Sequence, residues 1–321
     1  MTPVRSILRS REPRSILNQI KAQALEEISN ARISTGYLAH PITLYANDDS
    51  ADQLQPTSYN TPNGYIWILT TTTTSGEQEE TVFSVHGIIH QSELPPVTRT
   101  FGKHASAKHV QQKVVLTGLD SPTFSVAMEG LSNVERALRS HIRDDTNTPL
   151  PEIADHNTKI LISNRYFTSK RLANDEEHIG FTNEIDPKGI LERFRGDSLV
   201  HTNDNVVEYY ERRTNKGEQS FKRIPPSRIK NGDIVEIQFT TTLAESFVGK
   251  GQESRQTFNT KLILRSITLL DTTFSRAIAR DLEYKSKKPS LKRKIGHEEE
   301  ETREAQDRLK RMAIDCTNHV I

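Results

Sequence analysis

Apolar and polar residues alternate regularly from Val235 to Thr240. A period of two is typical of a strand with one buried face and one solvated face. Residues 258–270 carry apolar side chains on both sides, which favours a strand at the centre of a sheet. We predict that these two segments pair as neighbouring strands, joined by the glycine-containing connection at residues 245–255.

Earlier in the chain, β-branched and aromatic residues concentrate in short segments that predict further strands. Two of them, residues 64–74 and 81–89, predict a hairpin with a long loop. Shorter strands are expected at residues 113–119, 123–128 and 158–162. Polar, turn-rich or proline-containing sequence predicts loops at residues 41–63 and 91–110.

Helical spacing of apolar residues is present in three places. Residues 13–29 follow this spacing after Pro13, and proline is favoured in the first turn of a helix. Helices also fit residues 131–142 and 274–282. The first helix either packs on its own domain or binds a partner through its apolar side.

Changes in composition divide the chain. Residues 144–157 are polar and contain two prolines, which is typical of a linker. Beyond residue 283 the sequence is highly charged and holds too few apolar groups to offset its ordering entropy. We therefore expect a mainly β (α+β) protein with flanking helices. Its parts are an N-terminal helical segment (1–40), a first β-rich unit (41–143), a second β-rich unit (158–283) that is an OB-like barrel or small sandwich, and a charged C-terminal tail (284–321). The tail is expected to be disordered, or helical only with a partner.

The net charge does not indicate a particular kind of partner, because 43 basic and 42 acidic residues leave a net charge of only +1. The single cysteine, Cys316, excludes a framework of paired disulfides and a cysteine-based zinc site within one chain. The histidines are scattered, so no metal or other cofactor is expected. No apolar run is long enough to span a membrane.

The sequence contains no phosphate-binding loop, no nucleophile elbow and no His-Glu-x-x-His helix. His201, Asp204 and Asn205 form a polar cluster, for which turn and capping chemistry is the simpler interpretation. We expect a protein that is not an enzyme. A deep pocket that gathers His201, Asp204 and a basic group would favour an enzyme instead.

Four segments in one order carry a resemblance to a known family. They are Asp186-Pro187-x-Gly189, His201-Thr202-x-x-Asn205-x-Val207-x-Tyr209-Tyr210-Glu211, Gly232-Asp233-Ile234-Val235-Glu236, and Leu264-Arg265-Ser266-Ile267-Thr268-Leu269-Leu270-Asp271. Over residues 185–275 the chain resembles a protein family of mushroom-forming (basidiomycete) fungi to which no activity is assigned. The resemblance implies a fungal origin and no particular chemistry.

A strand entered through Gly232-Asp233 and paired with a long apolar strand resembles part of an OB-type barrel. Such barrels bind single strands by stacking bases on aromatic residues in a basic groove. The leading hypothesis is therefore a nucleic-acid-binding protein, for single-stranded or duplex DNA; an ordinary charged loop is the alternative. The candidate stacking residues are Tyr209, Tyr210, Phe221, Phe239 and Phe247, and the candidate phosphate contacts are Arg212, Arg213, Lys222, Arg223, Arg228, Lys230 and Lys250.

Basic residues also cluster in the tail, around Pro289. The residues Lys287, Lys288, Lys292, Arg293 and Lys294 fit a nuclear localisation signal, or they solubilise the tail. The nucleus is the expected location, and the cytoplasm is the alternative. The alternative function is a protein–protein interaction scaffold that uses the N-terminal helix or the tail.

Overall fold

The computed structural model describes residues 13–34, 40–47, 50, 54–61, 64–72, 76–140, 153–154, 159–173, 177–215, 218–248, 255–286 and 296–317. The chain divides into two compact units, residues 1–279 and 280–321. The first unit holds the strands and most helices. The second unit holds the end of α6 (Thr273–Ser286) and all of α7 (Gly296–Thr317).

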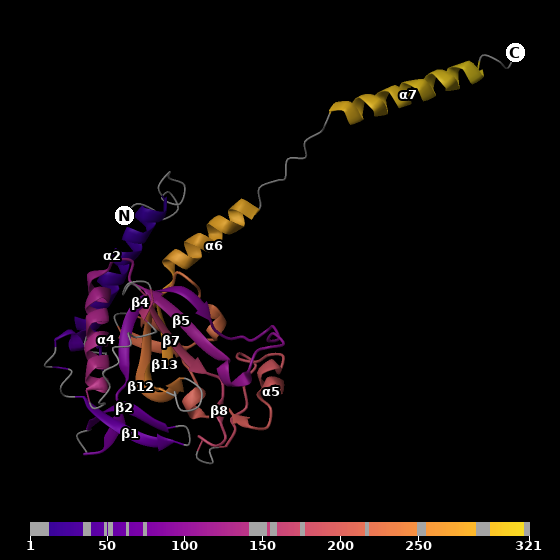
Figure 1. Ribbon diagram of the computed structural model, residues 1–321. Coiled ribbons are helices and arrows are strands. Elements are labelled where there is room, and N and C mark those ends of the chain that lie inside the picture. Colours follow the sequence, from indigo (N-terminus) through magenta and orange to yellow (C-terminus); the bar gives the residue numbers. More distant parts are fainter. Residues whose placement is uncertain are drawn as a thin grey trace. The chain divides into compact units, whose positions relative to one another are not determined.

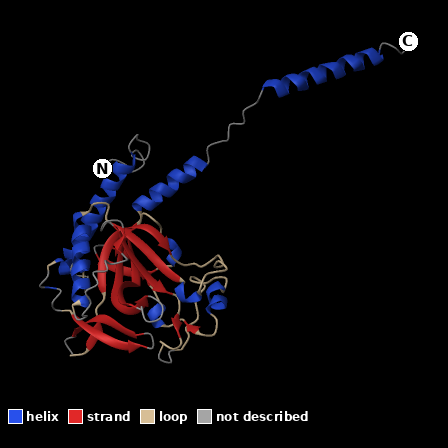
Figure 2. Cartoon of the chain, in the orientation of Figure 1, coloured by secondary structure: helices blue, strands red, loops and turns tan. Residues whose placement is uncertain are grey.

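Eleven strands join in one sheet, which curves strongly (Figure 1 and Figure 2). Their bounds are β1 (Gln55–Thr61), β2 (Gly64–Thr72), β3 (Gln78–Glu80), β4 (Phe83–Glu93), β5 (Gln111–Thr117), β6 (Ile153–Ala154), β7 (Lys159–Arg165), β10 (Glu208–Asn215), β11 (Glu218–Arg223), β12 (Ile234–Val248) and β13 (Arg255–Asp271). The short strands β8 (Thr168–Ser169) and β9 (Leu199–Val200) pair separately. The β-rich class with flanking helices is confirmed.

Five of these strands close a circuit, which we call the five-strand circuit. β4, β5 and β7 follow one another in antiparallel pairs, and β12 pairs antiparallel with both β13 and β4. A single parallel pair, Ile263 with Ser163, links β13 to β7 and completes the circuit. Further along the same edge of β13, β10 takes the place of β7, from Glu208 opposite Ser266 onward. The circuit is thus weakest where β7 and β10 diverge.

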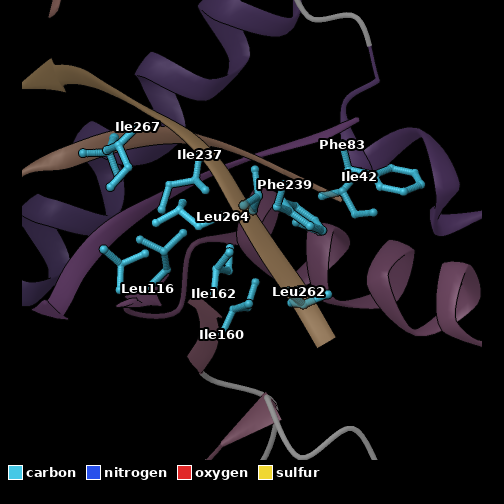
Figure 3. Close-up of a cluster of buried hydrophobic side chains, with 14 of the residues drawn as sticks. Ile42, Phe83, Leu116, Ile160, Ile162, Ile237, Phe239, Leu262, Leu264 and Ile267 are labelled. Carbon is cyan, nitrogen blue, oxygen red and sulfur yellow. The ribbon is translucent and has the colours of Figure 1, made fainter. Parts of the chain in front are cut away.

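The interior of the five-strand circuit is filled by apolar side chains from all of its strands (Figure 3). The predicted pair of strands is confirmed, because β12 and β13 are antiparallel along their length. Ile237 and Phe239 point inward from β12, as their alternation predicts. The predicted solvated face is wrong, because Glu236 and Thr240 are buried too, and Glu236 pairs with the buried Arg32. On β13 the buried set changes from Leu262 and Leu264 to Ile267 and Leu269 across a register shift at Arg265. Because of that β-bulge, the side chains that point inward change from even-numbered to odd-numbered positions.

Two helices lie side by side against the sheet, α2 (Pro13–Ser34) and α4 (Pro122–Arg139) (Figure 1). Helix α2 begins at Pro13, as predicted, and extends five residues beyond the predicted end. Its Glu26 accepts hydrogen bonds from the Ser121 hydroxyl at 2.6 Å and from the Thr123 amide at 3.0 Å. A carboxylate at this position satisfies the open amide groups of the α4 N-terminus and complements its dipole.

Three local predictions are corrected by the structure. Residues 123–128 are helical rather than a strand, because the Ser121 hydroxyl caps α4 and Pro122 fits its first turn. Strand β1 lies within the predicted loop 41–63. β2 and β4 form no hairpin, because β12 lies between them and pairs with both.

The strands of the two predicted β units form one sheet and one main core. β12 comes from the predicted second β-rich unit (158–283), but it pairs with β2 and β4 of the predicted first β-rich unit (41–143). Residues 144–157 therefore connect parts of one body. A smaller cluster of Tyr166, Phe167, Leu191 and Leu199 packs around α5 (Ile190–Arg195).

Candidate functional site

The candidate residues of the nucleic-acid hypothesis gather on the β10–β11 hairpin and just after it, near η4 (Pro226–Arg228). Lys250 and the tail residues 287, 288 and 292–294 lie outside the described residues. The hairpin extends the sheet from the edge of β13. The sequence hypothesis therefore did select residues that lie together in space.

The candidate stacking residues differ in exposure. Tyr209 is buried, and its hydroxyl donates to Oε1 of Gln112. Tyr210 is half-buried, whereas Phe221 is 45% exposed and lies 5.2 Å from the Arg32 guanidinium.

The prediction of Phe239 as a stacking residue is wrong, because its ring is buried in the core. The side chain of Phe247 lies outside what the structure describes. Of the described candidates, only Tyr210 and Phe221 can offer a ring to a base at the surface.

Several of the candidate phosphate contacts already have acidic partners. Arg213 and Arg228 each lie 3.0 Å from the Glu211 carboxylate, and Arg223 pairs with Glu208. Arg212 is half-buried, and its pKa is lowered by desolvation and by the charge of Arg32. Lys222 and Lys230 are exposed. The hairpin is therefore less basic in its local field than its arginine and lysine content suggests.

The cluster of His201, Asp204 and Asn205 mainly shapes the chain. Thr202 and Asn205 form a capping box around η3 (Asn203–Asn205). The backbone carbonyl of Asp204 accepts from the side-chain amide of Asn164 at 2.9 Å, and its carboxylate faces solvent. Capping chemistry, the simpler interpretation, accounts for Asn205, whereas His201 lines a pocket that Asp204 does not enter.

We call this first cavity the aromatic pocket. It measures about 170 Å³ and lies between the loop at residues 179–185 and the start of β10, where β7 and β10 diverge. Its lining residues are Gln112, Tyr166, Ile179, Gly180, Phe181, Thr182, Glu184, Ile185, His201, Asn205, Val206, Val207, Glu208, Tyr209, Arg223, Ile224 and Pro226. The pocket gathers His201 with a basic group, Arg223, and with the carboxylates of Glu184 and Glu208, but Asp204 does not line it.

A second cavity, which we call the basic pocket, measures about 260 Å³. Lys108 enters it from η2 (Ala107–His109), Arg165 from the end of β7 and Arg171 from the residues after β8. The other lining residues are Phe167, Thr168, Ser169, Leu172, Ser198 and Leu199, so none of the lining residues is acidic. The sequence hypothesis did not select any of these three cations.

The buried hydrogen bond of Tyr209 provides a direct test of this region. The Tyr209→Phe variant should lose about 1–3 kcal/mol of unfolding free energy, because Gln112 Oε1 keeps its desolvation cost without a donor. Tyr210→Phe is the matched control, since its half-buried hydroxyl lies 3.5 Å from Glu208 and should cost less than about 0.5 kcal/mol. Urea unfolding of both variants measures the difference. Equal losses would contradict this assignment.

The part of the chain that the structure describes contains no helix long and apolar enough to cross a membrane. Among the same residues, no group of three or more His, Cys, Asp and Glu side chains could hold a metal ion. No family model matches the sequence, and neither the curated proteins nor the solved structures contain a significant match. The resemblance to the basidiomycete family stays a prediction.

Proposed function

We propose that this chain is a non-enzymatic protein that binds single-stranded nucleic acid on the outer face of β5 and β7. The order of strands in the five-strand circuit supports this. If β4, β5, β7, β12 and β13 are numbered 1 to 5 in chain order, their order around the circuit is 1-2-3-5-4. The contact between strands 3 and 5 is parallel. OB-type barrels are five-stranded and partly open, and they bind oligonucleotides on strands two and three and on the loop between strands one and two.

The basic pocket lies where that comparison places the ligand, and this observation carries the proposal. Lys108 belongs to the connection between the first and second strands, and Arg165 ends the third strand. The side chains of Lys108, Arg165 and Arg171 are exposed, and none forms an ion pair with a described residue. Unneutralised cations around a hollow suit phosphate groups, which supply most of the affinity for single strands.

Two further lysines lie on the outer face of these two strands. Lys113 on β5 and Lys159 on β7 are in the alternate positions that do not point into the core. Lys113 lies 3.0 Å from Glu93 across the neighbouring strand. A backbone that runs from the basic pocket along β5 and β7 would therefore pass two further lysines.

The test is fluorescence anisotropy of the full chain with a labelled oligodeoxythymidine at several salt concentrations. Binding should weaken steeply as salt rises. The triple variant Lys108→Ala, Arg165→Ala, Arg171→Ala should lose at least about tenfold in affinity. Its salt slope should fall by about 2, because three single-strand phosphate contacts each contribute about 0.7.

A matched control removes the same charge from the hairpin, as Arg213→Ala, Arg223→Ala, Arg228→Ala. These arginines are already paired with Glu208 and Glu211, so the affinity should change less than about threefold. Equal losses in both triple variants would mean that only overall charge matters. No binding by the unmodified chain at low salt would reject the proposed function.

The helix α7 favours a second candidate function, a protein–protein interaction scaffold. From Glu300 to Arg311 every side chain is exposed, including Leu309 at 66%. A helix that buries none of these side chains suits a partner. In α2, by contrast, Leu17 and Leu25 are buried in the protein's own core, so its apolar side is not available. If oligonucleotides do not bind, the scaffold is the remaining candidate.

A further inference from the structure

The aromatic pocket has the features of a site for one flat ring system. Its volume of about 170 Å³ is well below the roughly 300–1,000 Å³ of sites for drug-sized ligands. The His201 and Phe181 rings lie 4.3 Å apart at 32°, and Tyr166 contacts Phe181 edge-on at 6.2 Å. Val207, Ile224 and Pro226 complete an apolar wall.

Two polar groups of this wall make no hydrogen bond to a described residue. Nδ1 of His201 lies 2.8 Å from the Tyr166 carbonyl oxygen, which can only accept, so Nδ1 carries the proton. Burial lowers the pKa of His201, so the ring is neutral and Nε2 presents a lone pair. Burial also raises the pKa of the Tyr166 hydroxyl, which stays a donor.

One acceptor and one hydroxyl therefore face the cavity from its ring-bearing wall. The polar lining is completed by Gln112, Thr182, Glu184, Asn205, Glu208 and Arg223. The Watson–Crick edge of every nucleobase presents a hydrogen-bond donor next to an acceptor. Bases also stack on aromatic side chains without regard to sequence. The two pockets are adjacent in the chain, because Tyr166 lines the aromatic pocket and Phe167 lines the basic pocket.

We propose that the aromatic pocket binds a single nucleobase, turned out of a strand whose phosphates lie in the basic pocket. The inference deepens the proposed function and rests on it for the source of the base. A free nucleotide would offer the same base chemistry, so the experiment separates the two sources. Gly180 lines the pocket, and a Cβ at this position meets no atom within 4 Å, so a large side chain can be placed beside the site without a clash.

The first arm compares a mixed-sequence oligonucleotide with an abasic one of equal length, by anisotropy. The unmodified chain should bind the base-containing strand at least about fivefold more tightly, since each stacked base adds that much or more. Gly180→Trp should remove this preference and leave the abasic affinity unchanged. Gly102→Trp is the matched control, because Gly102 is equally open but does not line either pocket.

The second arm uses free nucleoside monophosphates and saturation-transfer NMR. Base-proton signals that vanish in Gly180→Trp and persist in Gly102→Trp would support the pocket even if no strand binds. Strand binding that depends on the basic pocket, with no preference for bases over abasic strand, would overturn this inference and leave the proposed function intact. Signals from N-acetyl-tyrosinamide without signals from nucleotides would overturn it as well.

Discussion

Replacing Arg32 by alanine is expected to lower the free energy of unfolding by about 3–5 kcal/mol, because it leaves a buried carboxylate without its main partner. Arg32 lies near the end of α2, and Glu236 lies on the outer side of β12. Their side chains are only 3% and 2% exposed. Nε of Arg32 donates to Glu236 at 2.8 Å, and Nη2 donates to the second carboxylate oxygen at 3.5 Å.

The protonation of Glu236 shows what Arg32 contributes. Burial alone would raise the pKa of Glu236, but hydrogen bonds from His86 and Arg32, together with the charge of Arg32, hold that pKa below its usual value. A carboxyl with a lowered folded-state pKa stabilises the fold above the unfolded pKa, near 4.5, and loses this contribution as pH falls through the folded pKa. The stability difference between wild type and Arg32→Ala should therefore shrink below about pH 4.5.

Urea unfolding measured over a range of pH tests this prediction. The double variant Arg32→Met, Glu236→Leu should recover most of the loss, because removing both charges removes the desolvation cost. Arg223→Ala serves as the control for an exposed pair with Glu208 and should cost less than about 1 kcal/mol. A loss of under 1 kcal/mol for Arg32→Ala would show that Glu236 obtains its stabilisation elsewhere.

The sequence predicted the β12–β13 pair well because both strands show their burial in their own residues. On β13, apolar residues on both sides predict a central strand, and β13 does lie between β12 on one edge and β7 and β10 on the other. Part of the apolar pattern, however, comes from the register shift at Arg265, whose side chain reaches Glu80 at 3.1 Å. A register shift depends on the partner strand. The sequence of one strand therefore does not distinguish burial of both faces from a register shift within the strand.

Long-range pairing explains the other differences. β12 lies between β2 and β4, although 140 residues of chain separate the end of β4 from the start of β12. No local sequence pattern encodes such an insertion. The hairpin cations were predictable, and so was part of their neutralisation, since Glu211 and Arg213 are two apart on one strand face. The basic pocket was not predictable, because Lys108, Arg165 and Arg171 come together only through the fold.

The contact between α4 and the 3-10 helix η1 (Ile42–Ala46) allows a prediction with an unusual sign. Replacing a glycine by alanine in a helix normally stabilises it by about 1 kcal/mol. Gly130 lies inside α4, but a Cβ there would be 2.0 Å from the Ile42 carbonyl oxygen, which is backbone. We expect Gly130→Ala to destabilise the protein by about 3 kcal/mol, as overpacking of a closely packed contact does.

The segment η1 cannot move away cheaply. The side-chain amide of Asn133 donates to the carbonyl oxygens of Tyr45 and Ala46 at 3.0 and 2.9 Å. The Tyr45 ring packs edge-on against Phe83 in the core, with centroids 5.4 Å apart. A displacement of about 1 Å, the least that would relieve the clash, would therefore weaken both buried hydrogen bonds and open the core beside Phe83.

Thermal unfolding measures this effect, and about 3 kcal/mol should lower Tm by about 6–12 °C in a domain of this size. Gly102→Ala is the control, because a Cβ at Gly102 meets no atom within 4 Å and should leave Tm unchanged or slightly higher. If Gly130→Ala behaved like the control, α4 and η1 would be separable without cost. The buried amide of Asn133 would then have no carbonyl groups to bind, and the packing that covers this side of β4 would need a different explanation.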